Sequence, residues 1–189
     1  MRIIAGEARG RPIIAPKGQD TRPTQDHVRE SLFNILMRDV PDARVLDLFA
    51  GSGALALEAV SRGAESAVLV DHAAEAVACI RRNIETVRAD TCATVLHCGW
   101  EEALRRLHSE GRTFTLAFLD PPYRITDTGA QCARMADLNL LAQDAVIVVE
   151  HHWAHPPSLD ARFVPRSERR YGDTAVHLYR YQGGVMTDV

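Results

Sequence analysis

Lysine is nearly missing from this 189-residue chain: Lys17 is the only lysine among 22 lysine and arginine residues. Arginine offers a planar fork that suits phosphate, although the same bias also arises from genomic base composition. Long apolar runs are missing too, and no stretch reaches the roughly 18–20 apolar residues of a membrane helix. The first residues lack the apolar core of a signal peptide, so we expect a cytoplasmic protein with no membrane partner.

Cysteines are few, and nothing in their spacing pairs them. The four of them show no CxxC motif, and three fall within segments of apolar periodicity. We therefore expect reduced core residues rather than a disulfide or a metal site. The histidines from His151 to His155 resemble a metal-binding tract, but the strand expected before them and the prolines after them argue against a helix that would align them. No metal is expected, and the chain has no HExxH or Ser-His-Asp arrangement.

The composition is that of a globular protein, with 46% hydrophobic and 25% charged residues. The length suits one compact domain, which we place at residues 23–189, preceded by a small basic arm at residues 1–22. A net charge of −3 argues against a uniformly basic nucleic-acid binder. Residues 1–38 nevertheless hold seven basic residues against four acidic ones.

The arm alternates short apolar patches with glycine and proline, which predicts a short hairpin or an irregular segment. It carries Arg9, Arg11 and Arg22. Two interpretations stay open at this point: a solvated basic arm, or an appendage that contacts phosphates through counterion release. Pro23 and Thr24 then open a helix with Thr24 as N-cap, and Pro41 closes it.

From residue 44 onward, strand and helix patterns alternate, which predicts a mostly parallel sheet with helices on both faces. The expected strands are 44–49, 66–70, 94–97, 115–119 and 145–150, and the expected helices are 54–61, 73–88, 101–109 and 129–139. Two further strands, 161–165 and 174–181, are expected to add an antiparallel pair at the sheet edge. Ligands of such sheets bind at the carboxyl ends of the strands, near the switch in strand order.

A glycine turn follows the first strand, in the segment from Asp47 through Phe49 to Gly51 and Gly53. Glycines let a ligand approach the backbone, and the helix after them contributes free N–H groups. The segment is not GxGxxG, so a nucleoside with a cationic or zwitterionic tail fits better than a pyrophosphate. Asp71 ends the second strand, where an acid is placed to accept from both ribose hydroxyls. The alternatives are a tight strand–helix connection for the turn and an unpaired terminal acid for Asp71. The joint occurrence of Gly51, Gly53 and Asp71 argues against coincidence.

The fourth strand stops at Asp120, Pro121, Pro122 and Tyr123. Prolines cannot continue a central strand because they lack the N–H donor. The stiff turn presents a carboxylate, backbone carbonyls and a flat ring, which suits a planar nitrogen heterocycle held by its amino group. The alternative is a rigid turn with a solvated Asp and a packed Tyr.

These segments together resemble a class I S-adenosylmethionine-dependent methyltransferase that acts on an exocyclic base amine. More narrowly, the chain resembles the RsmD family of bacterial 16S ribosomal RNA guanine-N2 methyltransferases. The stretches that carry this closer resemblance are 2–6, 22–24, 28–33, 55–63, 149–151 and 171–174, and the match runs from Met1 to about Arg180. One departure is Cys98-Gly99-Trp100, where the family often has an acidic or amide residue near the cofactor adenine. Trp100 is therefore expected either to wall the adenine or to belong to the core.

The resemblance implies a Rossmann-like α/β fold with a mostly parallel sheet, an antiparallel C-terminal hairpin and a small N-terminal β-arm. It implies S-adenosylmethionine as cofactor, with S-adenosylhomocysteine as product, held by the Asp47–Gly53 turn, Asp71 and Trp100. It implies 16S ribosomal RNA as partner, within a small-subunit particle or an assembly intermediate.

The implied reaction is in-line methyl transfer to guanine N2. Asp120 and the carbonyl of Pro121 would accept the amine hydrogens, and Tyr123 would stack on the extruded base. The RNA-binding residues would be Arg9, Arg11, Arg22 and Arg29. Two alternatives remain: an exocyclic-amine methyltransferase acting on adenine or cytosine in DNA or other RNA, and a non-catalytic nucleotide- or RNA-binding module.

Overall fold

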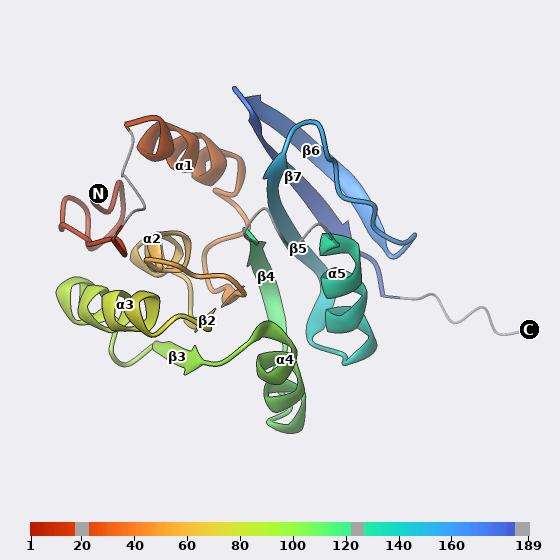
Figure 1. Cartoon of the computed structure of the whole chain (residues 1–189), viewed down its shortest axis with the longest axis horizontal. Helices are drawn as coiled ribbons and strands as arrows, with labels where there is room; N and C mark the ends of the chain where they lie inside the picture. The colour runs from red at the N-terminus through yellow and green to blue at the C-terminus, as the bar shows by residue number, and fades with distance from the viewer. Residues whose placement is uncertain (18–22, 122–126, 184–189) are drawn as a thin grey trace, which may run out of the picture.

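A seven-stranded sheet with the order β3-β2-β1-β4-β5-β7-β6 forms the centre of the molecule (Figure 1). The computed structural model describes residues 1–17, 23–121 and 127–183. The elements are α1 (Pro23–Ile35), β1 (Arg44–Asp47), α2 (Ala54–Ser61), β2 (Ser66–Asp71), α3 (Ala74–Val87), β3 (Ala93–His97), α4 (Trp100–Ser109), β4 (Phe114–Leu119), α5 (Thr128–Asp137), β5 (Leu141–His152), β6 (Phe163–Tyr171) and β7 (Thr174–Tyr181).

The first five strands are parallel, and the strand order reverses at β1. This strand pairs with β2 on one side and with β4 on the other. The loops after β1 and β4 therefore leave the same edge of the sheet and lead to helices on opposite faces. Ligands of open α/β sheets bind between two such loops. The predicted fold class is confirmed.

The C-terminal antiparallel pair is also confirmed, with β7 lying between β5 and β6. Val148 of β5 pairs with Leu178 of β7, and the register continues without a break to His152 and Thr174. Strand β5 runs from Leu141 to His152 and is thus longer than the predicted 145–150. His151 and His152 belong to this strand, so the expectation that they do not form a helix is confirmed.

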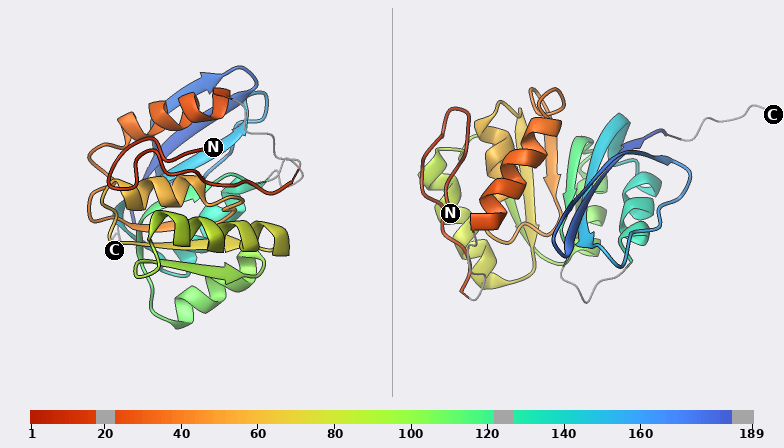
Figure 2. Two further views of the ribbon diagram at one scale, coloured as in Figure 1. Left: turned by 90° about the vertical axis from the view of Figure 1, so that its left-hand side faces the viewer. Right: turned by 90° about the horizontal axis from the view of Figure 1, so that it is seen from above.

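Helices cover both faces of the sheet (Figure 2). One buried cluster joins the arm, α1, α2 and α3 to one face, where Phe33 and Phe118 have ring centroids 6.0 Å apart. The other cluster joins α4 and α5 to the opposite face through residues such as Leu104 and Met135. Runs such as Leu116 to Leu119 are buried on both sides, which is why they read as continuous apolar strands.

The N-terminal arm folds back on itself as predicted, with an isolated bridge between Arg2 and Pro12. It is not a loosely solvated extension, because Ile3 and Ile13 are buried in the core. The carboxylate of Glu58, buried in α2, accepts hydrogen bonds from the backbone amides of the residues after Ile3. The arm is thereby fixed on the outer side of α2.

Helix α1 begins at Pro23, one residue before the predicted N-cap Thr24. It ends at Ile35, and a turn leads from there to Pro41. Proline therefore does not end this helix directly. Within the ranges that the structure describes, no helix is long and apolar enough to cross a membrane.

Candidate active site

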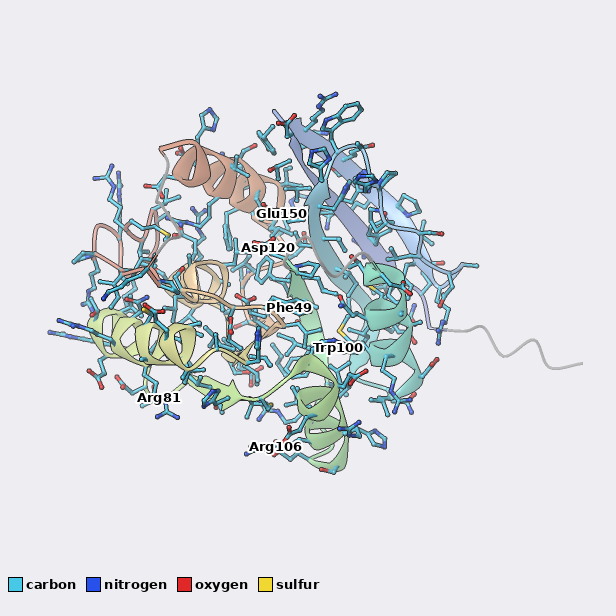
Figure 3. All side chains as sticks on the ribbon, viewed as in Figure 1. Phe49, Arg81, Trp100, Arg106, Asp120 and Glu150 are labelled. Carbon is cyan, nitrogen blue, oxygen red and sulfur yellow. The ribbon has the colours of Figure 1, made fainter. Side chains whose placement is uncertain are left out.

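Four carboxylates gather at the edge of the sheet where the parallel strands end. Asp47 ends β1, Asp71 ends β2, Asp120 follows β4, and Glu150 lies near the end of β5. Leu119 pairs with Val149, so Asp120 and Glu150 are the next residues along neighbouring strands. Figure 3 shows these two together beside the end of β4. The carboxyl ends of four strands therefore form one acidic rim, as the alternating pattern predicts.

The glycine turn and Asp71 are in direct contact. The amide of Gly51 donates a 2.9 Å hydrogen bond to Asp71 Oδ2, and the amide of Ala73 donates one of 2.9 Å to Oδ1. A carboxylate has about four acceptor positions, so each oxygen keeps capacity for a further donor. Asp71 is thus oriented in advance and still able to accept from a ligand.

Gly53 has no room for a side chain. Its φ is +79°, and an added Cβ would lie 2.9 Å from Leu69 Cδ2. A residue other than glycine would be strained here and would press on the core. The turn therefore keeps a bare backbone at the start of α2, as the sequence predicts.

Asp47 is 2% exposed. Burial, together with the neighbouring carboxylates of Asp120 and Asp71, raises its pKa to about 7, although the backbone amides of Ala56 and Phe49 oppose the shift. A buried acid among other acids lacks a counter-charge. It is placed to be stabilised by a ligand that carries positive charge.

Asp120 and Glu150 are neighbouring acids whose pKa values are both raised. Asp120 is exposed at the surface, yet desolvation by the protein around it raises its pKa to about 6. Desolvation and then the charge of Asp120 raise the pKa of Glu150 to about 8. The charge of Asp120 therefore opposes the ionisation of Glu150.

Half-buried apolar side chains lie beside the carboxylates. Phe49, Cys98 and Trp100 pack on the cluster that α4 and α5 form, and all three remain partly exposed. Trp100 is the first residue of α4 and lies three residues after the end of β3 at His97 (Figure 3). This placement fits both expectations for Trp100, because the ring contacts the core and still borders the rim.

The family model described as "Conserved hypothetical protein 95" matches residues 1–180. The chain belongs to this family. It is 36% identical to a Bacillus subtilis protein provisionally named rRNA methyltransferase YlbH, over 97% of this chain and all of that one. It is 35% identical to Ribosomal RNA small subunit methyltransferase D of Escherichia coli, over 100% of this chain and 93% of that one. The resemblance found in the sequence is confirmed.

Solved structures show the same likeness. An Escherichia coli protein provisionally described as methyltransferase yhhF superposes with a TM-score of 0.85 at 32% identity, covering 97% of this chain and 99% of that one. Since nearly the whole of both chains superposes, the arm and the C-terminal hairpin belong to the common architecture and are not additions to it.

The predicted arginines do not form one group. Arg9 is exposed, whereas Arg11 donates a 3.0 Å hydrogen bond to the carbonyl of Thr86. Arg29 is 4% exposed and pairs with Asp26 and Glu58. Arg29 as a phosphate contact is therefore wrong, because its guanidinium is itself buried and balances the buried carboxylate of Glu58.

Three of the predicted site residues lie outside the described part of the chain. They are Arg22, Pro122 and Tyr123. Pro121 is described and is half-buried directly after Asp120. Among the residues that can be placed, no group of three or more His, Cys, Asp or Glu side chains could hold a metal ion.

The sequence did not single out Asn83, which joins the arm to the glycine turn. Its side-chain amide donates 2.8 Å hydrogen bonds to the carbonyls of Ile14 and Ser52, and its Oδ1 accepts from the amide of Ile14 at 2.9 Å. A signal existed, because Asn83 lies on the apolar face of α3 between Ile80 and Ile84. A polar residue on a buried face usually makes specific hydrogen bonds.

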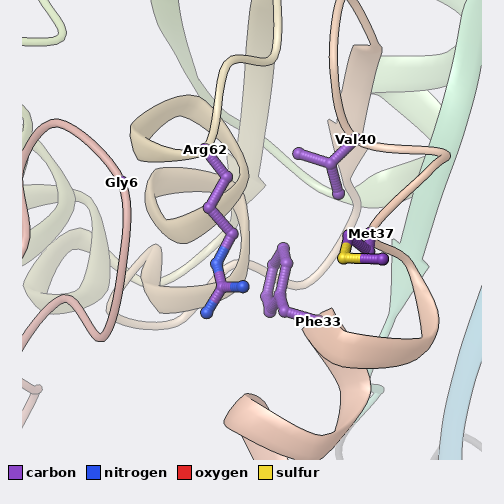
Figure 4. A pocket seen from close by; sticks show the side chains of 5 residues that line it. All are labelled: Gly6, Phe33, Met37, Val40 and Arg62. Atoms are coloured by element: carbon purple, nitrogen blue, oxygen red, sulfur yellow. The ribbon is translucent and has the colours of Figure 1, made fainter.

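A pocket of about 260 Å³ lies away from the rim, lined by Gly6, Phe33, Met37, Val40 and Arg62 (Figure 4). Arg62 follows the last turn of α2, and its guanidinium carbon lies 4.9 Å from the centre of the Phe33 ring. Helix α2 starts at the rim and ends at the opposite edge of the sheet. This pocket is therefore separate from the acidic rim.

Proposed function

We propose that this protein transfers a methyl group from S-adenosylmethionine to the exocyclic N2 amine of a guanine in small-subunit ribosomal RNA. Family membership supports the coarser part, methyl transfer to ribosomal RNA, because curated relatives that span nearly the whole chain carry that name. The observation that carries the proposal is the acidic rim at the carboxyl ends of the strands. This rim surrounds the bare glycine turn after β1 and includes Asp120, which Pro121 follows, after β4.

The rim residues suit the parts of S-adenosylmethionine, which supplies an electrophilic methyl group on a sulfonium when bound. Asp71 would accept from the ribose hydroxyls with its remaining acceptor positions. Asp47 would lose its proton and face the positively charged end, which relieves the repulsion that raises its pKa. Phe49 and Trp100 would wall the adenine, and Gly51 and Gly53 would allow close approach.

At the target base, Asp120 has to orient a poor nucleophile. The lone pair of an aryl amine is delocalised into the ring, so nitrogen must pyramidalise before it attacks. Asp120 and the carbonyl of Pro121 would accept the two amine hydrogens and turn the lone pair toward the methyl group. Tyr123 would stack on the base, which must leave its helix to be reached. Positioning of this kind lowers the barrier by up to roughly 7–11 kcal/mol.

RNA would approach across the arm and the C-terminal hairpin. Arg9 is exposed on the arm. Trp153 lies three residues beyond Glu150 and is 44% exposed, and the guanidinium carbon of Arg170 lies 3.8 Å from the centre of its ring. A cation stacked on an aromatic ring offers both charge for phosphate and a face for a base. A ribosomal particle or assembly intermediate would be the natural substrate, since such a footprint extends well beyond one nucleotide.

Replacing Asp120 tests the proposal. Asp120→Ala is expected to lower methyl transfer at saturating S-adenosylmethionine by about a hundredfold or more, because the amine is no longer oriented. S-adenosylhomocysteine affinity, measured by calorimetry, is expected to stay nearly unchanged, and Asp90→Ala serves as an exposed control. Normal turnover at saturation combined with lost cofactor affinity would overturn the role of Asp120.

The range of substrates separates the alternatives. Tritiated methyl transfer is measured with small-subunit particles, free ribosomal RNA and duplex DNA. Transfer to DNA alone would favour a DNA amine methyltransferase. Absence of transfer to every substrate, with S-adenosylhomocysteine still bound, would favour a non-catalytic binding module.

A further inference from the structure

Glu150 is a rigidly placed acid that the residues assigned above leave without a role. It lies inside β5, where its backbone is paired with Val176 of β7. The side chains of Phe118 and Val148 share one face of the sheet, so two residues further on Asp120 and Glu150 share that face too. Neighbouring strands are about 4.8 Å apart, which places the two carboxyl groups within reach of one small ligand.

No cation in the described part of the chain pairs with Glu150. It is half-buried, and no salt bridge or side-chain hydrogen bond joins it to any residue in the described ranges. Its one described electrostatic neighbour is another acid, Asp120, and together with partial burial that neighbour raises its pKa to about 8. A carboxyl group kept on a rigid strand without a donor is stabilised by a ligand that supplies one.

The bases differ in the hydrogen-bonding character of the ring nitrogen beside the exocyclic amine. In guanine the ring nitrogen next to the N2 amine carries a hydrogen and is a donor. In adenine and cytosine the ring nitrogen next to the amine is an acceptor. An ionised acid beside the amine-binding acid therefore attracts guanine, and the N1–H donor of guanine favours that ionised form. The lone pair of adenine or cytosine would instead face a carboxylate oxygen.

We propose that Glu150 accepts the N1–H of the target guanine while Asp120 accepts a hydrogen of its N2 amine. Glu150 is then the residue that selects guanine, whereas Asp120 and Pro121 recognise only the amine. This inference rests on the proposed function and deepens it, because it names the group that reads the ring behind the amine. One complementary hydrogen-bonded contact of this kind typically discriminates by about ten- to hundredfold.

The test uses the full-length protein and an RNA analogue that changes N1. Once the methylated guanine has been mapped, small-subunit RNA is ligated around a synthetic segment that carries guanine or 2-aminopurine at that position and is reconstituted into particles. 2-Aminopurine keeps the N2 amine, but its N1 is an acceptor. The wild-type protein is expected to show a kcat/KM for 2-aminopurine about ten- to hundredfold below that for guanine.

Glu150→Gln is expected to relax this preference. The glutamine amide can accept from guanine N1–H or donate to N1 of 2-aminopurine, so the ratio of the two kcat/KM values falls at least tenfold. Glu168→Gln, on β6 of the same sheet and 64% exposed, is the control and leaves the ratio unchanged. Binding of S-adenosylhomocysteine shows that each variant is folded.

Three outcomes overturn the inference in distinguishable ways. An unchanged ratio in folded Glu150→Gln, with the wild-type protein methylating guanine N2, refutes the role of Glu150 alone. Absence of guanine methylation by the wild-type protein refutes the proposed function and this inference with it. If Glu150→Gln does not fold, Glu150→Asp replaces it: the shorter acid draws back from N1–H, and guanine kcat/KM falls at least tenfold while that of 2-aminopurine does not. An equal fall for both bases refutes the inference.

Discussion

Replacing Glu58 by alanine removes the group that fixes the N-terminal arm. The Glu58 side chain is fully buried. Its Oε2 accepts from the amide of Ile4 at 2.8 Å, and its Oε1 accepts from the amide of Ala5 at 3.0 Å and from Arg62 Nε at 2.7 Å. Arg29 Nε lies 3.7 Å from the same carboxylate. Glu58→Ala therefore leaves two amides and Arg62 Nε without this acceptor, and the buried Arg29 without this counter-charge.

The cost follows from what stays buried. Burial already lowers the pKa of Arg29, and without Glu58 the one acid among the described residues that still balances its charge is Asp26. Removing one partner of a buried ion pair typically costs about 3–5 kcal/mol. That is a large part of the roughly 5–15 kcal/mol by which domains are stable. For a chain of this size each kcal/mol shifts the melting temperature by about 2–4 °C, so the expected fall is roughly 6–20 °C.

Urea unfolding followed by circular dichroism measures this cost. Glu85→Ala is the matched control, because Glu85 is an exposed glutamate within α3, and such substitutions usually stay within about 0.5 kcal/mol. A loss below about 1 kcal/mol for Glu58→Ala would refute the reasoning. It would mean that the arm is held by its apolar residues alone.

Three further changes test the site. Asn83→Ala breaks the link between Ile14 and the glycine turn and is expected to weaken S-adenosylhomocysteine binding about tenfold by calorimetry; unchanged affinity would contradict the link. Asp47 has a pKa raised to about 7, so the unbound protein loses stability as pH rises from about 4 to 7, and the stability gained by Asp47→Asn should grow over that range while S-adenosylmethionine binding weakens. If the stability gained by Asp47→Asn shrank with rising pH, the pKa of Asp47 could not be raised in the folded protein. Arg170→Ala removes the cation on Trp153 and is expected to lower RNA affinity and flatten its salt dependence, and an unchanged salt slope would remove this pair from the RNA surface.

The sequence predicted the helices and strands whose formation depends on residues close together in the chain. Strands such as 115–119 are buried on both sides and appear as unbroken apolar runs, and the carboxyl ends of parallel strands must meet. Asp71 and Gly51 were therefore predicted at one site, and the structure joins them by a hydrogen bond. The end of β5 was less predictable, because its extension to His152 depends on pairing with β7.

The wrong assignment of Arg29 and the missed role of Glu58 have one cause: the sequence does not show directly whether a side chain faces solvent or the core. Arg29 was assigned to RNA from the charge of its segment, yet it precedes Leu32 by three residues and Phe33 by four, and both are buried. That spacing places Arg29 on the inner face of α1. Its partner Glu58 is likewise an acid within an apolar helix, and neither could be paired before the fold brought α1 and α2 together.

Nucleoside analysis by mass spectrometry tests the central claim most directly. Small-subunit ribosomal particles that lack the modification are incubated with the protein and S-adenosylmethionine, and the RNA is digested to nucleosides. The account predicts N2-methylguanosine as the product, formed by the wild-type protein and lost with Asp120→Ala. Methylated adenosine or cytidine in place of N2-methylguanosine, or full N2-methylguanosine yield at the wild-type rate with Asp120→Ala, would contradict it.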